Sequence, residues 1–207
     1  MNKKHFHILG IAALALTACQ KPPVAQKAEV AAVFAPAKAD GKEFKLDIET
    51  SSVKWIGTKV TGKHNGTIKL KSGSVFFKDG KLVAGSFVAD MKSIEVLELT
   101  GDMKAKLTKH LLSADFFDTE KFPEGIFEIS SVEKNATGYF IQGNLTLKGI
   151  ARGISFDGTI LNDKNTPKSA KAIFNIDRKQ WGIIYPGRPD DLISDTINLT
   201  LDLKIKG

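Results

Sequence analysis

The chain has 207 residues and a formal net charge of +7, with 42% hydrophobic and 26% charged residues. This length accommodates one domain with tails or two small domains, and it excludes two large ones. The composition is typical of a chain that buries a core and is too apolar for a disordered protein. The single cysteine excludes an internal disulfide, a CxxC redox pair and a multi-cysteine zinc site.

The N-terminus has the pattern of a bacterial lipoprotein signal. Two lysines precede an apolar run over 6–16, which is much shorter than the ~20 residues needed to span a bilayer. The run ends in Leu-Thr-Ala-Cys, which resembles a lipobox. We therefore expect removal of residues 1–18 and acylation of Cys19 as a membrane anchor; an ordinary signal peptide with a stray cysteine is the alternative. Gln20 resembles an outer-membrane address, which predicts a periplasm-facing envelope lipoprotein.

The segment 19–42 is rich in alanine, proline and lysine and lacks strand alternation. Pro22, Pro23 and Pro36 would interrupt a helix. We expect a flexible linker that spans roughly 25 to 30 Å as a coil. The folded domain is then expected over 43–207.

From residue 43 onward the chain has the period of two that is typical of half-buried antiparallel strands. Strands are expected over 53–61, 68–77 and 82–91, from Phe127, Tyr139, Ile154 and Ala170 onward, and over the unbroken alternation of Ile197, Leu199, Leu201, Leu203 and Ile205. Asp79-Gly80 predicts a hairpin, and Asn65-Gly66 is a further turn signal. The pattern therefore predicts about eight strands at hairpin spacing.

One segment breaks the strand pattern. Met103, Leu107 and Leu111 recur at four-residue intervals, which predicts a short amphipathic helix over 102–112 with Asp102 as its cap. Strands before and after it, without a βαβ rhythm, favour an all-β antiparallel fold. Such a sheet can close into a barrel around one elongated ligand, although a β-sandwich has the same periodicity.

Common signatures of catalysis and cofactor binding are missing from the sequence. No HExxH, G-x-S-x-G or G-x-G-x-x-G motif occurs, and His64 and His110 are the histidines left after signal removal. We expect no enzymatic activity, no cofactor and no metal; a hydrolase using Asp115 or His64 is the minor alternative. His64 is expected in a loop. Alternating lysines are interpreted as the wetted face of the sheet rather than a nucleic-acid surface.

Aromatic side chains are concentrated at the inward positions of the predicted strands, where most must pack in the core. Small residues such as Gly57, Gly143 and Ala172 occur among them, and glycine inside a strand marks a bulge, a bend or a close approach. We hypothesise that these positions leave a tunnel for a long apolar molecule. The alternative is a structural or stress-protective envelope protein whose barrel is filled by side chains.

The run HLLSADFFD over 110–118, followed by Lys-Phe-Pro, resembles the signature of the YceI-like, polyisoprenoid-binding, lipocalin-like proteins. Blocks at 52–59, 85–94, 143–149 and 174–183 agree in order, so that the resemblance covers about 43–207. It implies an extended eight-stranded antiparallel barrel with one short helix near its mouth. It also implies an isoprenoid ligand, a polyisoprenoid or an isoprenoid quinone, in the lumen. A homodimer is left open.

We expect the ligand to contact residues of the barrel interior and mouth. These are Trp55, Phe87, Met91, Phe116, Phe117, Phe127, Ile141, Gly143, Leu145, Phe156, Phe174 and Trp181. Of the adjacent rings at 116 and 117, we expect one in the mouth and one beneath the helix. Arg178 is expected either to fix a loop through a carboxylate or to contact a ligand headgroup.

Overall fold

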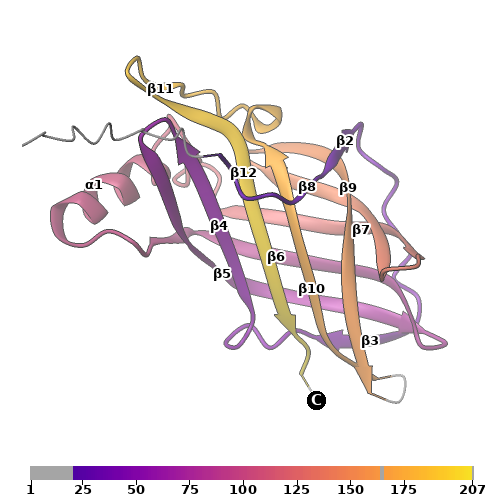
Figure 1. Ribbon diagram of the computed structural model, residues 1–207. Coiled ribbons are helices and arrows are strands. Elements are labelled where there is room, and N and C mark those ends of the chain that lie inside the picture. Colours follow the sequence, from indigo (N-terminus) through magenta and orange to yellow (C-terminus); the bar gives the residue numbers. More distant parts are fainter. Residues whose placement is uncertain (1–20, 164–165, 207) are drawn as a thin grey trace, which may run out of the picture.

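The computed structural model describes residues 21–163 and 166–206, most of which lie in strands (Figure 1). Eight long strands follow one another around a closed ring with antiparallel neighbours throughout, and β12 closes the ring onto β4. The ring consists of β4 (Ser52–Lys59), β5 (Gly62–Lys78), β6 (Lys81–Val96), β7 (Glu124–Lys134), β8 (Tyr139–Leu147), β9 (Ile150–Asp163), β10 (Thr166–Asp177) and β12 (Asp191–Lys204). The predicted eight-stranded barrel is therefore confirmed, and the sandwich alternative is wrong.

Side-chain alternation explains why these strands close around an apolar interior. Trp55 and Gly57 of β4 lie opposite Leu199 and Ile197 of β12, so the apolar phase of both strands faces inward. Inward residues of all eight strands join one hydrophobic cluster. Closure also gives each of the eight ring strands a neighbouring strand on both sides.

The hairpin signals have different outcomes. Asp79-Gly80 forms the turn between β5 and β6 with positive φ at both residues, which is the geometry that Asp-Gly favours. Asn65-Gly66, in contrast, lies inside β5. A Cβ on Gly66 would stand 2.7 Å from the Trp55 indole, so the glycine serves a close approach rather than a turn. The loop prediction for His64 is therefore wrong.

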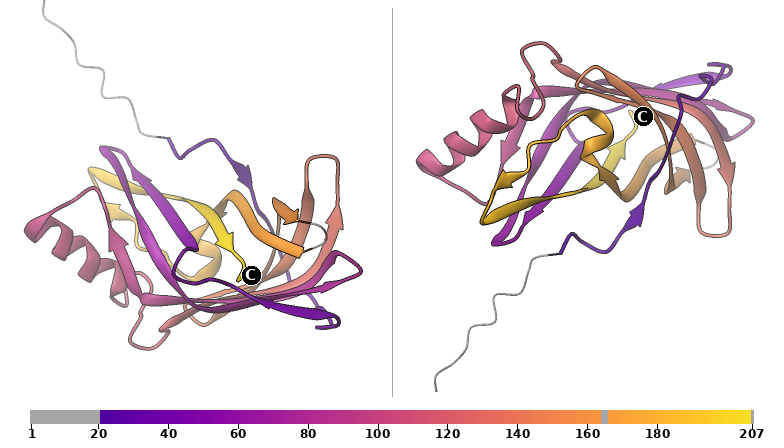
Figure 2. Two further views of the ribbon diagram at one scale, coloured as in Figure 1. Left: turned by 90° about the horizontal axis from the view of Figure 1, so that it is seen from below. Right: turned by 90° about the horizontal axis from the view of Figure 1, so that it is seen from above.

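The helix α1 (Gly101–Leu112) lies at one end of the barrel and confirms the predicted helix (Figure 2). Its N-cap is Thr100 rather than Asp102. Leu111 is buried whereas Met103 is exposed, so the predicted apolar stripe packs on the barrel only toward its C-terminal end. The first turn of α1 projects away from the barrel.

Short elements complete the fold. The strand β3 (Lys42–Lys45) pairs with the C-terminal half of β5, and β11 (Gly187–Arg188) pairs with the start of β12. The 3-10 helix η1 (Arg178–Trp181) follows β10 directly. Within the part of the chain that the structure describes, no helix has the length and apolar character to cross a membrane.

Residues 21–34, which we call the N-terminal strap, correct the prediction of a flexible linker. β1 (Gln26–Lys27) pairs with β10 in parallel, and β2 (Glu29–Ala31) pairs with β9 antiparallel. β9 and β10 pair with each other only over the half next to their hairpin. The strap therefore lies between the two strands where they separate.

Contacts from distant strands hold the strap in place. Ala28 is 2% exposed and belongs to the main hydrophobic cluster. The Asn144 amide exchanges hydrogen bonds of 2.8 and 3.0 Å with the backbone of Phe34. A Cβ on Gly153 would lie 2.3 Å from the Ala32 carbonyl oxygen, so glycine permits the close approach of the strap. These partners lie more than 100 positions away, which is why local composition indicated a linker.

We predict that Ala28→Glu detaches the strap, because it places a carboxylate in a site without room or a partner. The expected cost is roughly 2 to 4 kcal/mol in the free energy of unfolding, measured by urea denaturation, with faster amide exchange in β9 and β10. Val24→Glu is the matched control, since Val24 is exposed in the same segment. Equal effects of the two substitutions would show that the strap does not stabilise the barrel.

Candidate ligand-binding cavity

The barrel encloses a cavity of about 450 Å³, within the range of roughly 300 to 1,000 Å³ that is common for small-molecule sites. Inward side chains of all eight ring strands line it, and nearly all of them are apolar. On β12 and just after it, the unbroken alternation from Ile197 to Ile205 lines the cavity, and Asp191 and Ile193 extend the lining toward the start of the strand. At about 3.3 Å per residue and a tilt near 40°, the span from Ile197 to Ile205 corresponds to roughly 20 Å along the barrel axis.

Four phenylalanine rings from four strands cross one wall of the cavity. Phe87 and Phe127 stack with centroids 6.2 Å apart, Phe127 and Phe156 are 5.6 Å apart, and Phe156 and Phe174 stack at 4.1 Å. Such contacts fix ring orientations beyond what burial alone supplies. The cavity therefore has at least one wall of firmly packed side chains.

Ten of the twelve residues expected to contact a ligand line this cavity. They are Trp55, Phe87, Met91, Phe116, Phe117, Phe127, Ile141, Leu145, Phe156 and Phe174. The period-two phase of the strands brings eight of them together, since alternate residues share the inner face, whereas Phe116 and Phe117 come from the loop after α1. Their contact with a ligand remains a prediction.

Gly143 and Trp181 lie outside the lining, which corrects their placement. A Cβ on Gly143 would stand 2.5 Å from the Phe127 ring, so the space over this glycine is filled by that ring and adds nothing to the cavity. Trp181 is fully buried in η1, and its indole N–H donates to the Leu145 carbonyl at 2.9 Å. Trp181 follows β10 and lies in η1, so the alternation of the strand does not decide where its side chain points.

The helix and the following loop cover one end of the barrel, which we call the mouth. Leu107, His110 and Leu111 of α1 line the cavity there, together with Phe116 and Phe117. The His110 ring meets the Phe116 ring edge to face, with centroids 5.2 Å apart. Both phenylalanines therefore face the cavity, rather than one facing the mouth and the other lying only beneath the helix.

An ion pair lies beside the mouth. The Lys59 ammonium donates to Asp191, and the backbone N–H and hydroxyl of Thr61 donate to the other oxygen of this carboxylate at 3.0 and 2.9 Å. The Lys59 hydrogen bond is the main cause that lowers the pKa of Asp191 to about 2. The pair joins the β4–β5 turn to the start of β12.

A second polar contact lies on the neighbouring strand. Nδ1 of His64 is 2.6 Å from the Glu98 carboxylate, which also accepts the Asn65 backbone N–H at 2.9 Å. Burial raises the pKa of Glu98, but these hydrogen bonds outweigh it and lower the pKa overall. Because Lys59 and His64 both line the cavity, polar atoms are available at this end.

Sequence reasoning missed Lys59 and His64 as cavity residues, although the signal was present. Continuing the inward phase of Trp55 and Gly57 by one step reaches Lys59, and counting back from Ile68 in steps of two reaches His64. An apolar-only criterion passed over Lys59 within the expected strand 53–61, and it began the next strand at Ile68, six residues after the start of β5 at Gly62. Exposed residues line the cavity at two places: Arg188 at the mouth, and Thr159 and Lys171 on the paired strands β9 and β10.

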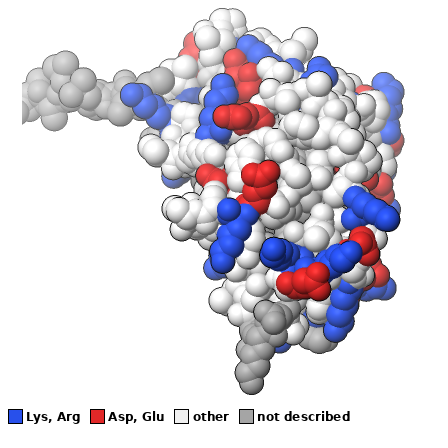
Figure 3. Space-filling view, turned by 90° about the vertical axis from the view of Figure 1, so that its right-hand side faces the viewer, with Lys and Arg blue, Asp and Glu red and all other residues white. Residues whose placement is uncertain are grey.

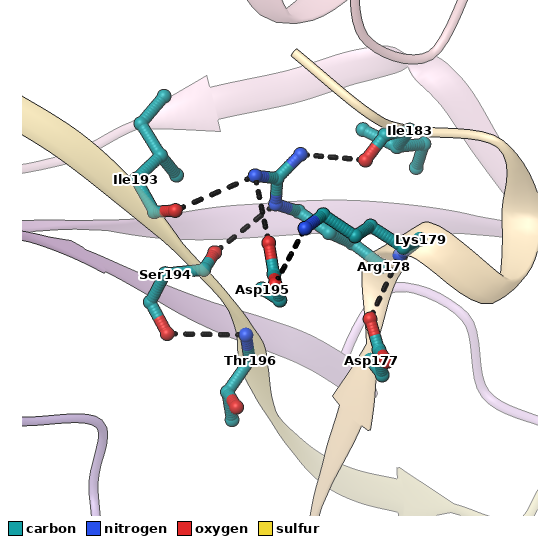
Figure 4. Close-up of polar contacts among 8 residues, drawn as sticks. All are labelled: Asp177, Arg178, Lys179, Ile183, Ile193, Ser194, Asp195 and Thr196. Atoms are coloured by element: carbon teal, nitrogen blue, oxygen red, sulfur yellow. Dashed lines mark hydrogen bonds and ion pairs between the residues drawn. The ribbon is translucent and has the colours of Figure 1, made fainter. Parts of the chain in front are cut away.

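Arg178 is almost fully buried behind the mouth (Figure 4). Its guanidinium donates to the carbonyls of Ser194, Ile183 and Ile193 and to the Asp195 carboxylate. Burial lowers the pKa of this guanidinium, and the charge of Asp195 opposes that shift. Of the two expected roles, the structure shows the loop-fixing one.

The chemistry of the cavity favours binding of an apolar molecule with a polar end. Among residues 21–163 and 166–206, no group of three His, Cys, Asp or Glu side chains is arranged to hold a metal ion. The interior offers shape and apolar surface, and the polar contacts of Lys59 and His64 lie at one end.

The fold and cavity define a lipocalin-like barrel, and sequence comparison gives its family. The YceI-like domain matches residues 44–205, so the chain belongs to the YceI-like family. A UPF0312 protein of Yersinia enterocolitica is 34% identical over 91 residues, which is 40% of this chain and 47% of that protein. One from Serratia proteamaculans is 40% identical over 63 residues, or 30% and 33% of the two chains. The matched regions thus span less than half the length of these relatives.

Solved structures share the fold. BcnA of Burkholderia cenocepacia has a TM-score of 0.64 and 19% identity, covering 78% of this chain and 99% of BcnA. A polyisoprenoid binding domain from Saccharophagus degradans has a TM-score of 0.60 and 13% identity, covering 79% and 98%. At these identities the likeness establishes the barrel fold alone.

We predict that Arg178→Met destabilises the barrel by about 3 kcal/mol, because it leaves three carbonyls without their donor and removes one of the two cationic partners of Asp195. Urea denaturation measures the change. Lys179→Met is the control: this lysine also pairs with Asp195 but is half exposed, so less than about 1 kcal/mol is expected. A small effect at Arg178 would mean that water replaces its hydrogen bonds.

Proposed function

We propose that this protein binds a long isoprenoid lipid, a polyisoprenoid or an isoprenoid quinone, and sequesters or transfers it in the bacterial envelope without catalysing a reaction. The observation that carries the proposal is the continuous apolar cavity along the barrel axis. The polyisoprenoid binding domain with the same fold adds support. A barrel filled by its own side chains, the structural alternative, is disfavoured by the size of this cavity.

The energetics of such binding are favourable. Burying a five-carbon prenyl unit removes about 100 Å² of apolar surface from water, which is worth roughly 2 to 3 kcal/mol. Several units in a cavity of this length offset the loss of translational and rotational freedom on association. A polar headgroup would face Lys59 and His64 at the mouth instead of losing its hydration in the interior.

Membrane attachment is a second part of the proposal. Cys19 lies outside the described residues, and we propose that it carries the acyl anchor. The carbonyl of Pro23, four positions later, already accepts a hydrogen bond from Asn175 of β10. Four residues span at most roughly 14 Å, so the anchor would hold the barrel close to the bilayer.

Labelling cells with an alkyne-bearing fatty acid tests the anchor. The full chain is expected to take up the label and to fractionate with outer membranes, and Cys19→Ser is expected to abolish the labelling. Labelling that persists in the Cys19→Ser variant, or a wild-type chain without label, would contradict acylation at this residue.

Organic extraction of the purified full chain, followed by mass spectrometry, tests the ligand. A prenyl lipid is expected in the extract. Ala172→Phe is expected to weaken prenyl-lipid binding by roughly 30- to 150-fold, because the new ring takes the room of about one prenyl unit. Fluorescence titration measures the dissociation constant.

Ile173→Phe is the matched control, since it adds the same ring to the same strand on the exposed outer face. It should leave binding unchanged. The Ala172 variant should also keep most of its folding stability, because a cavity accepts the ring. A wild-type chain that yields no lipid and takes up none, or equal affinities of the two variants, would rule out binding in the barrel.

A further inference from the structure

The mouth is surrounded by exposed apolar side chains, which we call the mouth rim. Nine large hydrophobic side chains are exposed in the described parts of the chain, and five of them, between 44 and 68% exposed, belong to the rim. The rim consists of Val60, Leu97, Met103, Ile184 and Leu192. An apolar group of this kind on a soluble barrel marks an interaction surface.

Rim residues are next to cavity-lining residues, which places them around the opening. Val60 follows Lys59, and its N–H donates to the Leu192 carbonyl at 3.1 Å. Met103 lies one helical turn before Leu107, and Ile184 separates the lining residues Ile183 and Tyr185. Leu97 donates its N–H to Asn65 beside His64. The apolar surface therefore continues from the cavity onto the rim.

Helix α1, beside the rim, has a net positive charge that suits an anionic partner. Helix α1 carries Lys104, Lys106 and Lys109 against the single acid Asp102. Among the described residues, the lysines at 106 and 109 form no ion pair. The side of the barrel turned away from α1 has basic and acidic side chains interspersed (Figure 3). Lysines beside exposed apolar residues are typical of a helix that lies on an anionic lipid surface.

The N-terminal strap adds an independent constraint on orientation. Asn175, which holds Pro23, is two residues before the end of β10, and Arg178 of the following η1 lines the cavity behind the mouth. The strap therefore begins on the mouth half of the barrel.

We propose that the mouth rim docks on an anionic phospholipid bilayer, with the cavity opening onto the membrane. Hydrophobic rim side chains enter the headgroup region, and the α1 lysines contact lipid phosphates. The functional meaning rests on the proposed lipid binding, because a prenyl chain then passes between bilayer and cavity without crossing water.

The orientation is tested with site-specific fluorophores on the full chain. Cys19→Ser removes its one cysteine, and Met103→Cys or Leu161→Cys then supplies a single labelling site. Leu161 is exposed at the end of β9 that leads to the β9–β10 hairpin, near the second place where the cavity lining is exposed. With vesicles of phosphatidylglycerol and phosphatidylethanolamine that carry a depth-dependent quencher, the label at 103 is expected to be quenched and the label at 161 is not. The reverse pattern, or equal quenching, would overturn the proposal.

Rim substitutions test the energetics in the same cysteine-free chain. Met103→Asp with Leu192→Asp is expected to weaken vesicle binding about tenfold or more, and salt is expected to weaken binding of the parent chain. Leu161→Asp with Ile173→Asp is the matched control and should bind vesicles as the parent does. Normal vesicle binding by the rim variant would contradict docking on a bilayer. A parent chain that is a dimer, with a rim variant that is a monomer, would show that the rim binds a second copy of the chain instead.

The affinity for farnesol, a short soluble prenyl alcohol, distinguishes failure of the rim proposal from failure of the proposed function. The rim variant should keep the farnesol affinity of the parent, because neither substituted residue lines the cavity. A parent chain that docks through its rim yet binds no farnesol would contradict prenyl binding alone. A parent that binds farnesol but does not dock would contradict the rim proposal alone.

Discussion

Backbone N–H and C=O groups along a strand need partners, and in this protein the need is greatest where β9 and β10 separate. These strands pair near their hairpin and separate toward the mouth, which would leave two facing edges unsatisfied. The N-terminal strap supplies the partners through β1 and β2. It also places Ala28 in the core, so the wall stays continuous around the apolar cavity.

The distribution of polar groups follows from the cost of removing them from water. The interior is lined by aliphatic and aromatic side chains, and the charged groups that reach it lie where solvent or a partner satisfies them. Lys59 is paired with Asp191, and His64 with Glu98. Arg178, the one charged residue among the large side chains that are fully buried in the described range, is held by three carbonyls and a carboxylate. The barrel therefore separates an apolar interior from polar groups at its mouth.

Local periodicity was sufficient to predict the eight long strands, the helix and the eight expected cavity residues that lie on strands, because an alternating strand has only one apolar face. Phe116 and Phe117, in the loop after α1, were expected from the resemblance to the YceI-like signature. It failed where long-range contacts decide. The strap has no strong pattern of its own, and its partners lie more than 100 residues away. Gly66 and Gly143 leave room for aromatic rings that pack over them. From the sequence, Gly66 had indicated a turn and Gly143 an open space in the interior, because the packing ring comes from another strand and is not visible in the local pattern. Trp181 is oriented by η1, whose short turn interrupts the strand phase.

Because the strap fills the gap between β9 and β10, the folded domain includes residues before the family match. The region that matches the YceI-like domain begins at residue 44, after the strap has ended. A chain that began at that boundary would lack β1 and β2, so a gap would remain between β9 and β10 and the apolar interior would be exposed to neighbouring molecules. Such a fragment would aggregate or pair with a strand of another molecule, so residues 21–34 are as much a part of the barrel as its eight long strands.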